Sequence, residues 1–213
     1  MNTDELIALL ASGSGSVDRR GQARRFALGL LCGGLAAALL MAALFGVRAD
    51  LAQVAATPLF WAKAALPLSL AAIALCLVGR LGRPGVAGGA AWPCLALPLL
   101  AVWAAAALAL LGVPAGERAS LVLGHTWRTC PFNILLLSVP TFIGVFWALR
   151  GLAPTRPRLA GAAGGLLASA MATTVYCLHC PEMAPPFWGA WYVLGMLLPT
   201  LAGALAGPRL LRW

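Results

Sequence analysis

Three cysteines and two histidines in the second half of the chain are the residues best suited to chemistry. Cys177 and Cys180 are separated by two residues, a spacing that allows either a redox-active disulfide or a pair of soft metal ligands. Cys130 begins another apolar stretch, and His125 and His179 lie close to these cysteines in the sequence. Three interpretations are open from the residues alone: a redox-responsive or structural disulfide, a metal contact, or thiols with no special role.

Six long apolar stretches must position these side chains. Each is about 18 to 22 residues long, which at about 1.5 Å per helical residue matches a hydrocarbon core of about 30 Å. With 62% hydrophobic and only 10% charged residues, the chain has the composition of an integral membrane protein. We therefore predict an all-α, polytopic membrane protein with six transmembrane helices, at 26–47, 59–78, 90–111, 132–149, 159–178 and 187–205.

The basic residues between these stretches predict the orientation. With the N-terminus in the cytoplasm, only Arg48, Lys63, Arg118 and Arg128 lie outside. Because loops rich in arginine and lysine stay in the cytoplasm, both termini are predicted to be cytoplasmic, in a bacterial inner membrane. The residues predicted inside are Arg19, Arg20, Arg24, Arg25, Arg80, Arg83, Arg150, Arg156, Arg158, Arg209 and Arg212.

This orientation divides the six cysteines into two groups. Three lie in the first three apolar stretches, where a cysteine commonly behaves as a small buried apolar side chain; they are Cys32, Cys76 and Cys94. The other three lie at the outer ends of the fourth and fifth stretches, on the oxidising side of the membrane; they are Cys130, Cys177 and Cys180.

The charges argue against several function classes. A net charge of +9 does not indicate nucleic-acid binding here, because the arginines lie at helix ends next to anionic lipid. A small transporter needs ionisable groups at membrane depth, and Lys63 is predicted near the outer boundary, where it can extend to the headgroups. A membrane thiol-disulfide oxidoreductase commonly needs two dithiol couples, whereas the outer side offers three cysteines. Both are alternatives to a non-enzymatic regulator.

The first 25 residues are the only substantial polar segment, and 26–213 form the predicted membrane domain. Thr3 or Asp4 can cap a short helix with an acidic first turn, and its apolar side would include Leu6 and Ile7. The Ser/Gly-rich segment 12–16 is typical of a flexible tether. A short helix on a tether favours a segment that binds a partner, and a tail without a role is the alternative.

Several segments resemble the NrsF-type bacterial anti-sigma factors, six-helix inner-membrane proteins that restrain an extracytoplasmic-function sigma factor. The most specific are Thr3-Asp4-Glu5-Leu6-Ile7 and His179-Cys180-Pro181-Glu182. The resemblance covers most of the chain, and its other segments are 130–138, 153–157 and the closing 209–213.

The resemblance implies a function and a site. The segment Thr3–Ile7 would bind the sigma factor and hold it from RNA polymerase. Cys130 and Cys180, with Cys177 and His179 beside them, would sense oxidative or heavy-metal stress, and helix movement would then release the sigma factor. Cys177 is additional to the family pair, so which thiols couple is left open. No cofactor and no catalytic residue are implied.

Overall fold

A computed structural model describes residues 2–13, 19–86 and 88–212, and within them six helical segments are long and apolar enough to cross a membrane. These segments are Gly21–Leu44, Pro58–Leu81, Ala91–Leu111, Cys130–Leu149, Pro157–Tyr176 and Pro185–Leu210. Each overlaps one predicted stretch, and the described residues contain no strand, so the prediction of an all-α protein with six spans is confirmed. Most of the predicted tether, 14–16, and the last residue of the closing motif, Trp213, lie outside the described residues.

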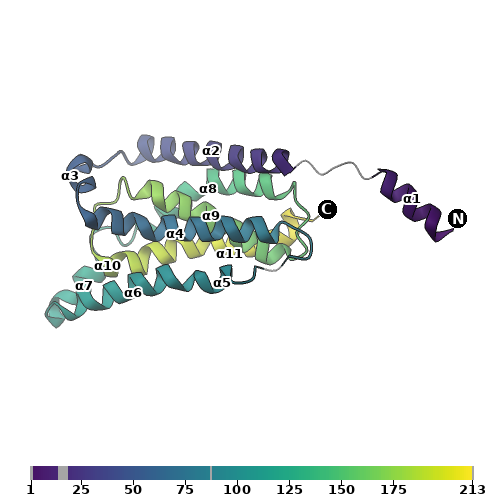
Figure 1. The fold of residues 1–213 in the computed structure, drawn as a ribbon. Helices are drawn as coiled ribbons and strands as arrows, with labels where there is room; N and C mark the ends of the chain where they lie inside the picture. The colour runs from purple at the N-terminus through teal and green to yellow at the C-terminus, as the bar shows by residue number, and fades with distance from the viewer. Residues whose placement is uncertain (1, 14–18, 87, 213) are drawn as a thin grey trace.

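The helices lie in a bundle with two distinct ends (Figure 1). Their order is α1 (Thr3–Gly13), α2 (Arg19–Leu44), α3 (Leu51–Ala55), α4 (Pro58–Leu81), α5 (Ala91–Cys94), α6 (Ala96–Leu111), α7 (Ala115–Leu123), α8 (Cys130–Leu149), α9 (Pro157–Tyr176), α10 (Pro185–Phe187), the π-helical turn η1 (Trp188–Tyr192) and α11 (Val193–Leu210). Helices α3 and α7, which lie in connections, were not predicted.

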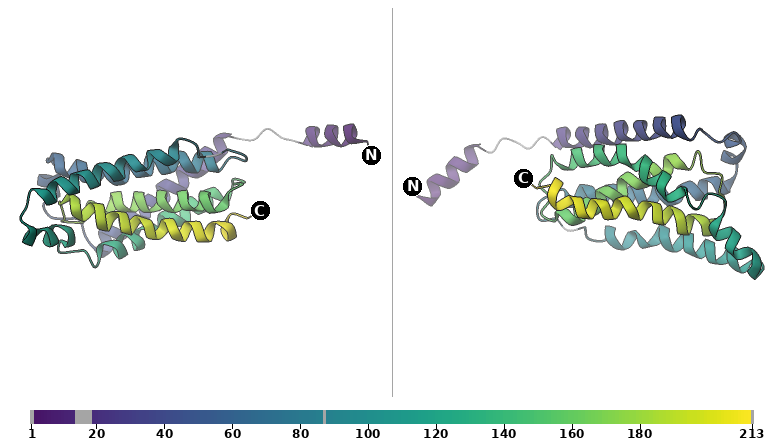
Figure 2. Two further views of the ribbon diagram at one scale, coloured as in Figure 1. Left: turned by 90° about the horizontal axis from the view of Figure 1, so that it is seen from below. Right: turned by 180° about the vertical axis from the view of Figure 1, so that it is seen from behind.

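One end of the bundle carries the start of α2 and the end of α11, and we call it the terminal end (Figure 1). The opposite end carries α3, α7 and α10 together with Cys130, Cys177 and Cys180, and we call it the cysteine end. Helix α1 stands apart from the bundle, beyond the terminal end, in all three views (Figures 1 and 2). The tail helix and the three cysteines are therefore separated by the length of the bundle.

Helix α9 is the centre of the bundle, and α6 lies at its edge. Of the α9 span, 67% is buried, against 11% of the span that contains α5 and α6. Helix α9 contacts α2, α4, α8 and α11. The third span is broken at Leu95, between α5 and α6. Pro98 explains the break, because it lacks the N–H that would bond to the carbonyl of Cys94.

Glycines allow α9 and α11 to touch backbone to backbone. A Cβ atom placed on Gly161 would collide with the carbonyl oxygen of Gly203, and one on Gly165 would collide with that of Pro199. Lipid tails are as apolar as leucine, so packing of this kind, rather than burial of apolar surface, holds membrane helices together. Gly161 and Gly165 on α9 are spaced by four residues, as are Gly203 and Gly207 on α11, so each pair lies on one face of its helix.

Gly161→Ala is expected to destabilise the protein, whereas Gly79→Ala is not. The new methyl group at position 161 forces two backbones apart, at a cost of about 1–3 kcal/mol, while nothing lies within 4 Å of a Cβ at Gly79 in α4. Thermal unfolding in detergent should show a midpoint roughly 5 °C lower for the first variant only. Equal midpoints for the two variants would contradict the close packing of α9 on α11.

Candidate functional site

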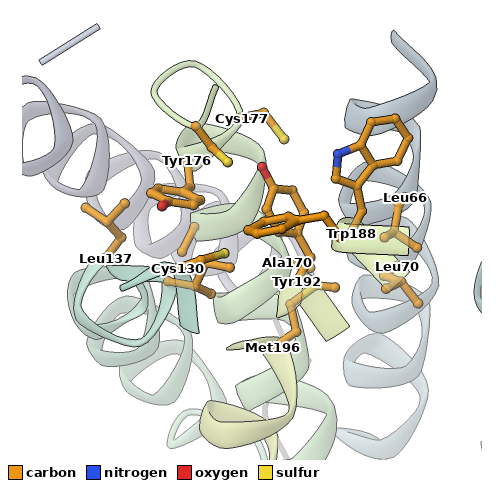
Figure 3. Close-up of a cluster of buried hydrophobic side chains, with 14 of the residues drawn as sticks. Leu66, Leu70, Cys130, Leu137, Ala170, Tyr176, Cys177, Trp188, Tyr192 and Met196 are labelled. Carbon is orange, nitrogen blue, oxygen red and sulfur yellow. The ribbon is translucent and has the colours of Figure 1, made fainter. Parts of the chain in front are cut away.

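The three cysteines of the cysteine end lie buried in one cluster. Cys130 is the first residue of α8, Cys177 directly follows the last residue of α9, and Cys180 ends the turn that comes next. All three are 0% exposed and belong to the same apolar core (Figure 3). The three thiols come together at the cysteine end, in agreement with their predicted positions at the outer ends of the fourth and fifth stretches. Helix α9 ends at Tyr176, whereas the predicted stretch ends at residue 178.

Two buried tyrosines frame the thiols. The hydroxyl of Tyr176, the last residue of α9, accepts a hydrogen bond from Asn133 Nδ2 at 3.4 Å and lies against Cys130. The hydroxyl of Tyr192 points toward Cys177 (Figure 3). Tyr192 belongs to the π-helical turn η1. Such turns are rare and frequently occur at functional sites.

Lys63 is fully buried beside the thiols, and the prediction that it extends to the headgroups is wrong. Its side chain is 0% exposed, and Nζ donates a hydrogen bond of 2.6 Å to the carbonyl oxygen of Cys180. Nζ also lies 5.7 Å from the centroid of the Tyr192 ring. An ionisable side chain inside a membrane span is costly, so its presence indicates a function. Lys63 is the main site residue that sequence reasoning missed.

Residues 177–184, which we call the cysteine loop, are held by the connection between α2 and α3. The backbone N–H of Arg48 donates to Leu178 O at 3.2 Å, and Arg48 Nη1 donates to Cys180 O at 3.3 Å. His179 Nδ1 lies 2.9 Å from Gly46 O. The connection that follows α2 is therefore bonded to the cysteine loop, so a movement of the loop would also move the end of α2.

Asp50 fixes the guanidinium of Arg48. Two hydrogen bonds, of 2.7 Å from Nε and 2.8 Å from Nη2, join it to the two carboxylate oxygens. The hydrogen bond to Asp50 raises the pKa of Arg48, and the same bond lowers the pKa of the Asp50 carboxyl. Both groups stay charged through the physiological pH range, so the hold of Arg48 on the cysteine loop does not change with pH there.

Glu182 ties the cysteine loop to the connection between α7 and α8. Its Oε1 accepts hydrogen bonds from the backbone N–H of His125 at 2.7 Å and of Thr126 at 3.1 Å. Its own carbonyl accepts a bond of 3.1 Å from Trp188 Nε1. The loop is thus bonded to the connections on both sides of the cluster. Glu182 was predicted only as part of a motif, with no role assigned.

The site does not have the form of a metal centre. Among the residues that the structure describes, no three His, Cys, Asp or Glu side chains are grouped so as to hold a metal ion. His179 Nδ1 lies 2.9 Å from Gly46 O, and the backbone N–H of His125 donates to Glu182 Oε1. All six cysteines are free thiols, and burial raises the pKa of Cys177, outside the spans, to about 12. The Cys177 thiol is therefore protonated at neutral pH.

Helix α2 connects the cysteine end to the tail. It packs along α8, where Thr141 Oγ1 donates to Gly33 O at 3.3 Å. At the terminal end Arg25 Nη2 donates to Trp147 O at 2.8 Å, and the guanidinium lies 4.4 Å from the centre of the Trp147 ring. The helix that begins next to the tail thus ends next to the cysteine loop, and it is bonded to α8, which begins at Cys130.

The predicted partner-binding residues lie on α1 and are all exposed. They are Thr3, Asp4, Glu5, Leu6 and Ile7. The predicted cap, Thr3 or Asp4, is wrong, because α1 begins at Thr3 and Asn2 precedes it. Glu5 Oε2 accepts a hydrogen bond of 3.2 Å from the N–H of Asn2, as the third residue of a capping box does. Leu6 and Ile7 present an uncovered apolar surface next to two carboxylates.

Comparisons with known proteins show which family the chain belongs to. The family described as "Negative regulator of sigma F" (NrsF) matches residues 10–213. The chain belongs to the NrsF family. It is 48% identical over 213 residues to a probable anti-sigma-F factor NrsF of Azospira oryzae, and 41% identical over 214 residues to the anti-sigma-F factor NrsF of Caulobacter vibrioides. Each comparison covers all of both chains. No solved structure matches the chain significantly.

Membership of the NrsF family confirms the resemblance found in the sequence. Its relatives are anti-sigma-F factors, which implies a sigma factor as the partner and a regulatory role. The NrsF match begins at residue 10, after the segment Thr3–Ile7, while both relatives align with the tail as well.

Proposed function

We propose that this chain is an inner-membrane anti-sigma factor that holds an extracytoplasmic-function sigma factor through Thr3–Ile7 and releases it when Cys130 and Cys180 are oxidised. The observation that carries the proposal is the connection between the two sites. An exposed helix with acidic and apolar side chains lies beyond one end of the bundle, and three buried thiols lie at the other. Helix α2 runs between them.

The orientation belongs to the same proposal: the terminal end faces the cytoplasm and the cysteine end the periplasm. The distribution of charge supports it, because the acidic residues described in 19–86 and 88–212 lie at the cysteine end, as Asp50, Glu117 and Glu182, while most arginines lie at the terminal end. Positively charged connections remain in the cytoplasm. The tail then lies in the compartment of a sigma factor, and the thiols lie in the oxidising one.

Release begins with a two-electron oxidation. The thiols of Cys130 and Cys180 lose two protons and two electrons to an oxidant, and a disulfide forms between their sulfur atoms. The new bond joins the first residue of α8 to a loop that Lys63 and Arg48 hold in place. Moving that loop moves its bonds to the end of α2, and α8 itself packs along α2. A small shift at the cysteine end can therefore reach the tail through packed helices.

Two observations favour a redox switch over the alternatives. Thiols that are 0% exposed suit an internal disulfide better than exchange with a protein substrate, which needs access. The three thiols also lack the grouping with histidine or carboxylate that a metal sensor would use, among the side chains described. The third thiol, Cys177, serves in this proposal as a neighbour rather than as a partner, because the resemblance implies the pair Cys130 and Cys180.

The experiment is a sigma-dependent reporter exposed to a thiol oxidant such as diamide. Cys130→Ser and Cys180→Ser should each abolish induction while the protein level stays constant. Cys76→Ser is the matched control, because Cys76 is exposed on α4, and it should respond like the wild type. Normal induction in both outer-cysteine variants would reject the redox part of the proposal.

A further inference from the structure

Three arginines converge on one hollow at the terminal end. The hollow has a volume of about 410 Å³ and is lined by Arg158, Arg209 and Arg212 together with Leu205 and Pro208. Arg158 lies in the first turn of α9, Arg209 lies in the last turn of α11, and Arg212 lies two residues beyond the end of α11. All three side chains are exposed. Two helices that run in opposite directions therefore bring their basic ends to the same place.

Close backbone packing fixes this convergence. A Cβ atom on Gly207 would collide with the carbonyl oxygen of Pro157, at the start of α9. The contact holds the first turn of α9 against the last turn of α11, so that Arg158 and Arg209 cannot separate without breaking the helix pair. The hollow is thus a fixed feature of the bundle rather than a chance meeting of long side chains.

The surroundings of the hollow favour an anion. No Asp or Glu of the bundle lies at the terminal end among the described residues. No side chain caps the start of α9, and the positive end of its helix dipole adds to the arginines. The carbonyl end of α11 is already bonded, since Arg150 Nε donates to Leu210 O at 3.0 Å. The three lining guanidinium groups suit phosphate, which they bind through paired hydrogen bonds.

The side chains below the arginines favour a lipid over a free phosphate. Leu201, Leu205 and Arg209 are spaced by four residues, so they lie along one face of α11. Leu205 is 77% exposed and Leu201 is 51% exposed, within a segment long and apolar enough to span the membrane. An apolar strip that leads up to a cluster of arginines matches an acyl chain below a phosphate headgroup.

We propose that this hollow binds the headgroup of an anionic phospholipid, with the acyl chains lying against Leu201 and Leu205. The site is separate from the cysteine end and does not depend on the proposed sigma-factor function. In the proposed orientation it faces the cytoplasmic leaflet, where basic pockets between membrane helices bind anionic headgroups.

The test is native mass spectrometry of the full-length protein in detergent with added lipid. Dioleoyl-phosphatidylglycerol should bind the wild type more tightly than dioleoyl-phosphatidylcholine, which has the same acyl chains. The variant Arg158→Gln/Arg209→Gln/Arg212→Gln should lose this preference, with affinity falling about fivefold for each arginine removed. Helix content and thermal midpoint, measured on the same samples, confirm that the variant is folded.

Arg24→Gln/Arg83→Gln is the control, because both arginines are exposed at the terminal end but lie outside the hollow. It should keep the wild-type preference. Equal binding of the two lipids by the wild type, or an equal loss in the control, would overturn the proposal. So would displacement of the phosphatidylglycerol by an equal concentration of inorganic phosphate, since that would show an anion site without lipid recognition.

Discussion

Asp4→Ala combined with Leu6→Ala is expected to abolish retention of the sigma factor and to leave sigma-dependent transcription permanently on. The substitutions remove one acidic contact and one apolar anchor from α1, whose side chains at both positions are exposed. Two hot-spot side chains at about 2 kcal/mol each correspond to roughly a thousandfold loss of affinity. Co-purification of a sigma-F-type factor from the same organism with the full-length protein measures the effect.

Glu117→Ala combined with Leu111→Ala is the matched control. It removes the same kinds of side chain from exposed positions at the cysteine end, and it should bind the sigma factor like the wild type. Undiminished binding by the tail variant would show that Thr3–Ile7 is not the contact surface.

Lys63→Met is expected to release the sigma factor without stress while leaving the protein at least as stable as the wild type. Methionine keeps most of the volume but removes the hydrogen bond to Cys180 O. A hydrogen bond from a charged group contributes about 1.5–3 kcal/mol, and we expect this one to favour the reduced position of the cysteine loop. Losing about 2 kcal/mol of that preference moves the balance between holding and release by roughly thirtyfold.

Stability and signalling should separate in this variant. A buried ammonium is costly to desolvate, so an apolar replacement of similar shape is often neutral or stabilising. Thermal unfolding should therefore show an unchanged or higher midpoint, while a sigma-dependent reporter is high without oxidant. Ser69→Ala, which removes only a bond from Ser69 Oγ to Leu66 O on the same helix, should leave the reporter low. A Lys63→Met variant that is unstable and still silent would contradict the role given to Lys63.

The sequence could predict the six spans because length and hydropathy determine them. Each observed span overlaps its predicted stretch, and the largest differences are at ends such as Gly21 and Leu210, where a polar or basic residue continues the helix beyond the apolar core. The grouping of Cys130, Cys177 and Cys180 was also predictable, because the fourth stretch was expected to begin, and the fifth to end, on the same side of the membrane. Depth in the membrane follows directly from position in a span.

Which face of each helix is buried in the bundle could not be predicted in the same way. Helix α4 is apolar on all sides, so its sequence does not show that Lys63 lies on the buried face with Leu66 and Leu70, while Trp61 is exposed. The one feature of the sequence that marked Lys63 as a site residue was the presence of a charged side chain inside a predicted span. The contribution of Tyr192 depends on a π-helical turn, which no residue pattern in this segment indicates. Helix α7 did have a signal, since Pro114 and Glu117 mark its start.

The most direct test of the central claim is release of the sigma factor by oxidation of the full-length protein in lipid nanodiscs, where both faces are accessible. The reduced protein should bind the sigma factor, diamide should release it, and dithiothreitol should restore binding. The Cys130→Ser/Cys180→Ser variant should hold the sigma factor under both conditions. Oxidised wild-type protein that forms the disulfide and still holds its sigma factor would contradict the coupling between the thiols and the tail.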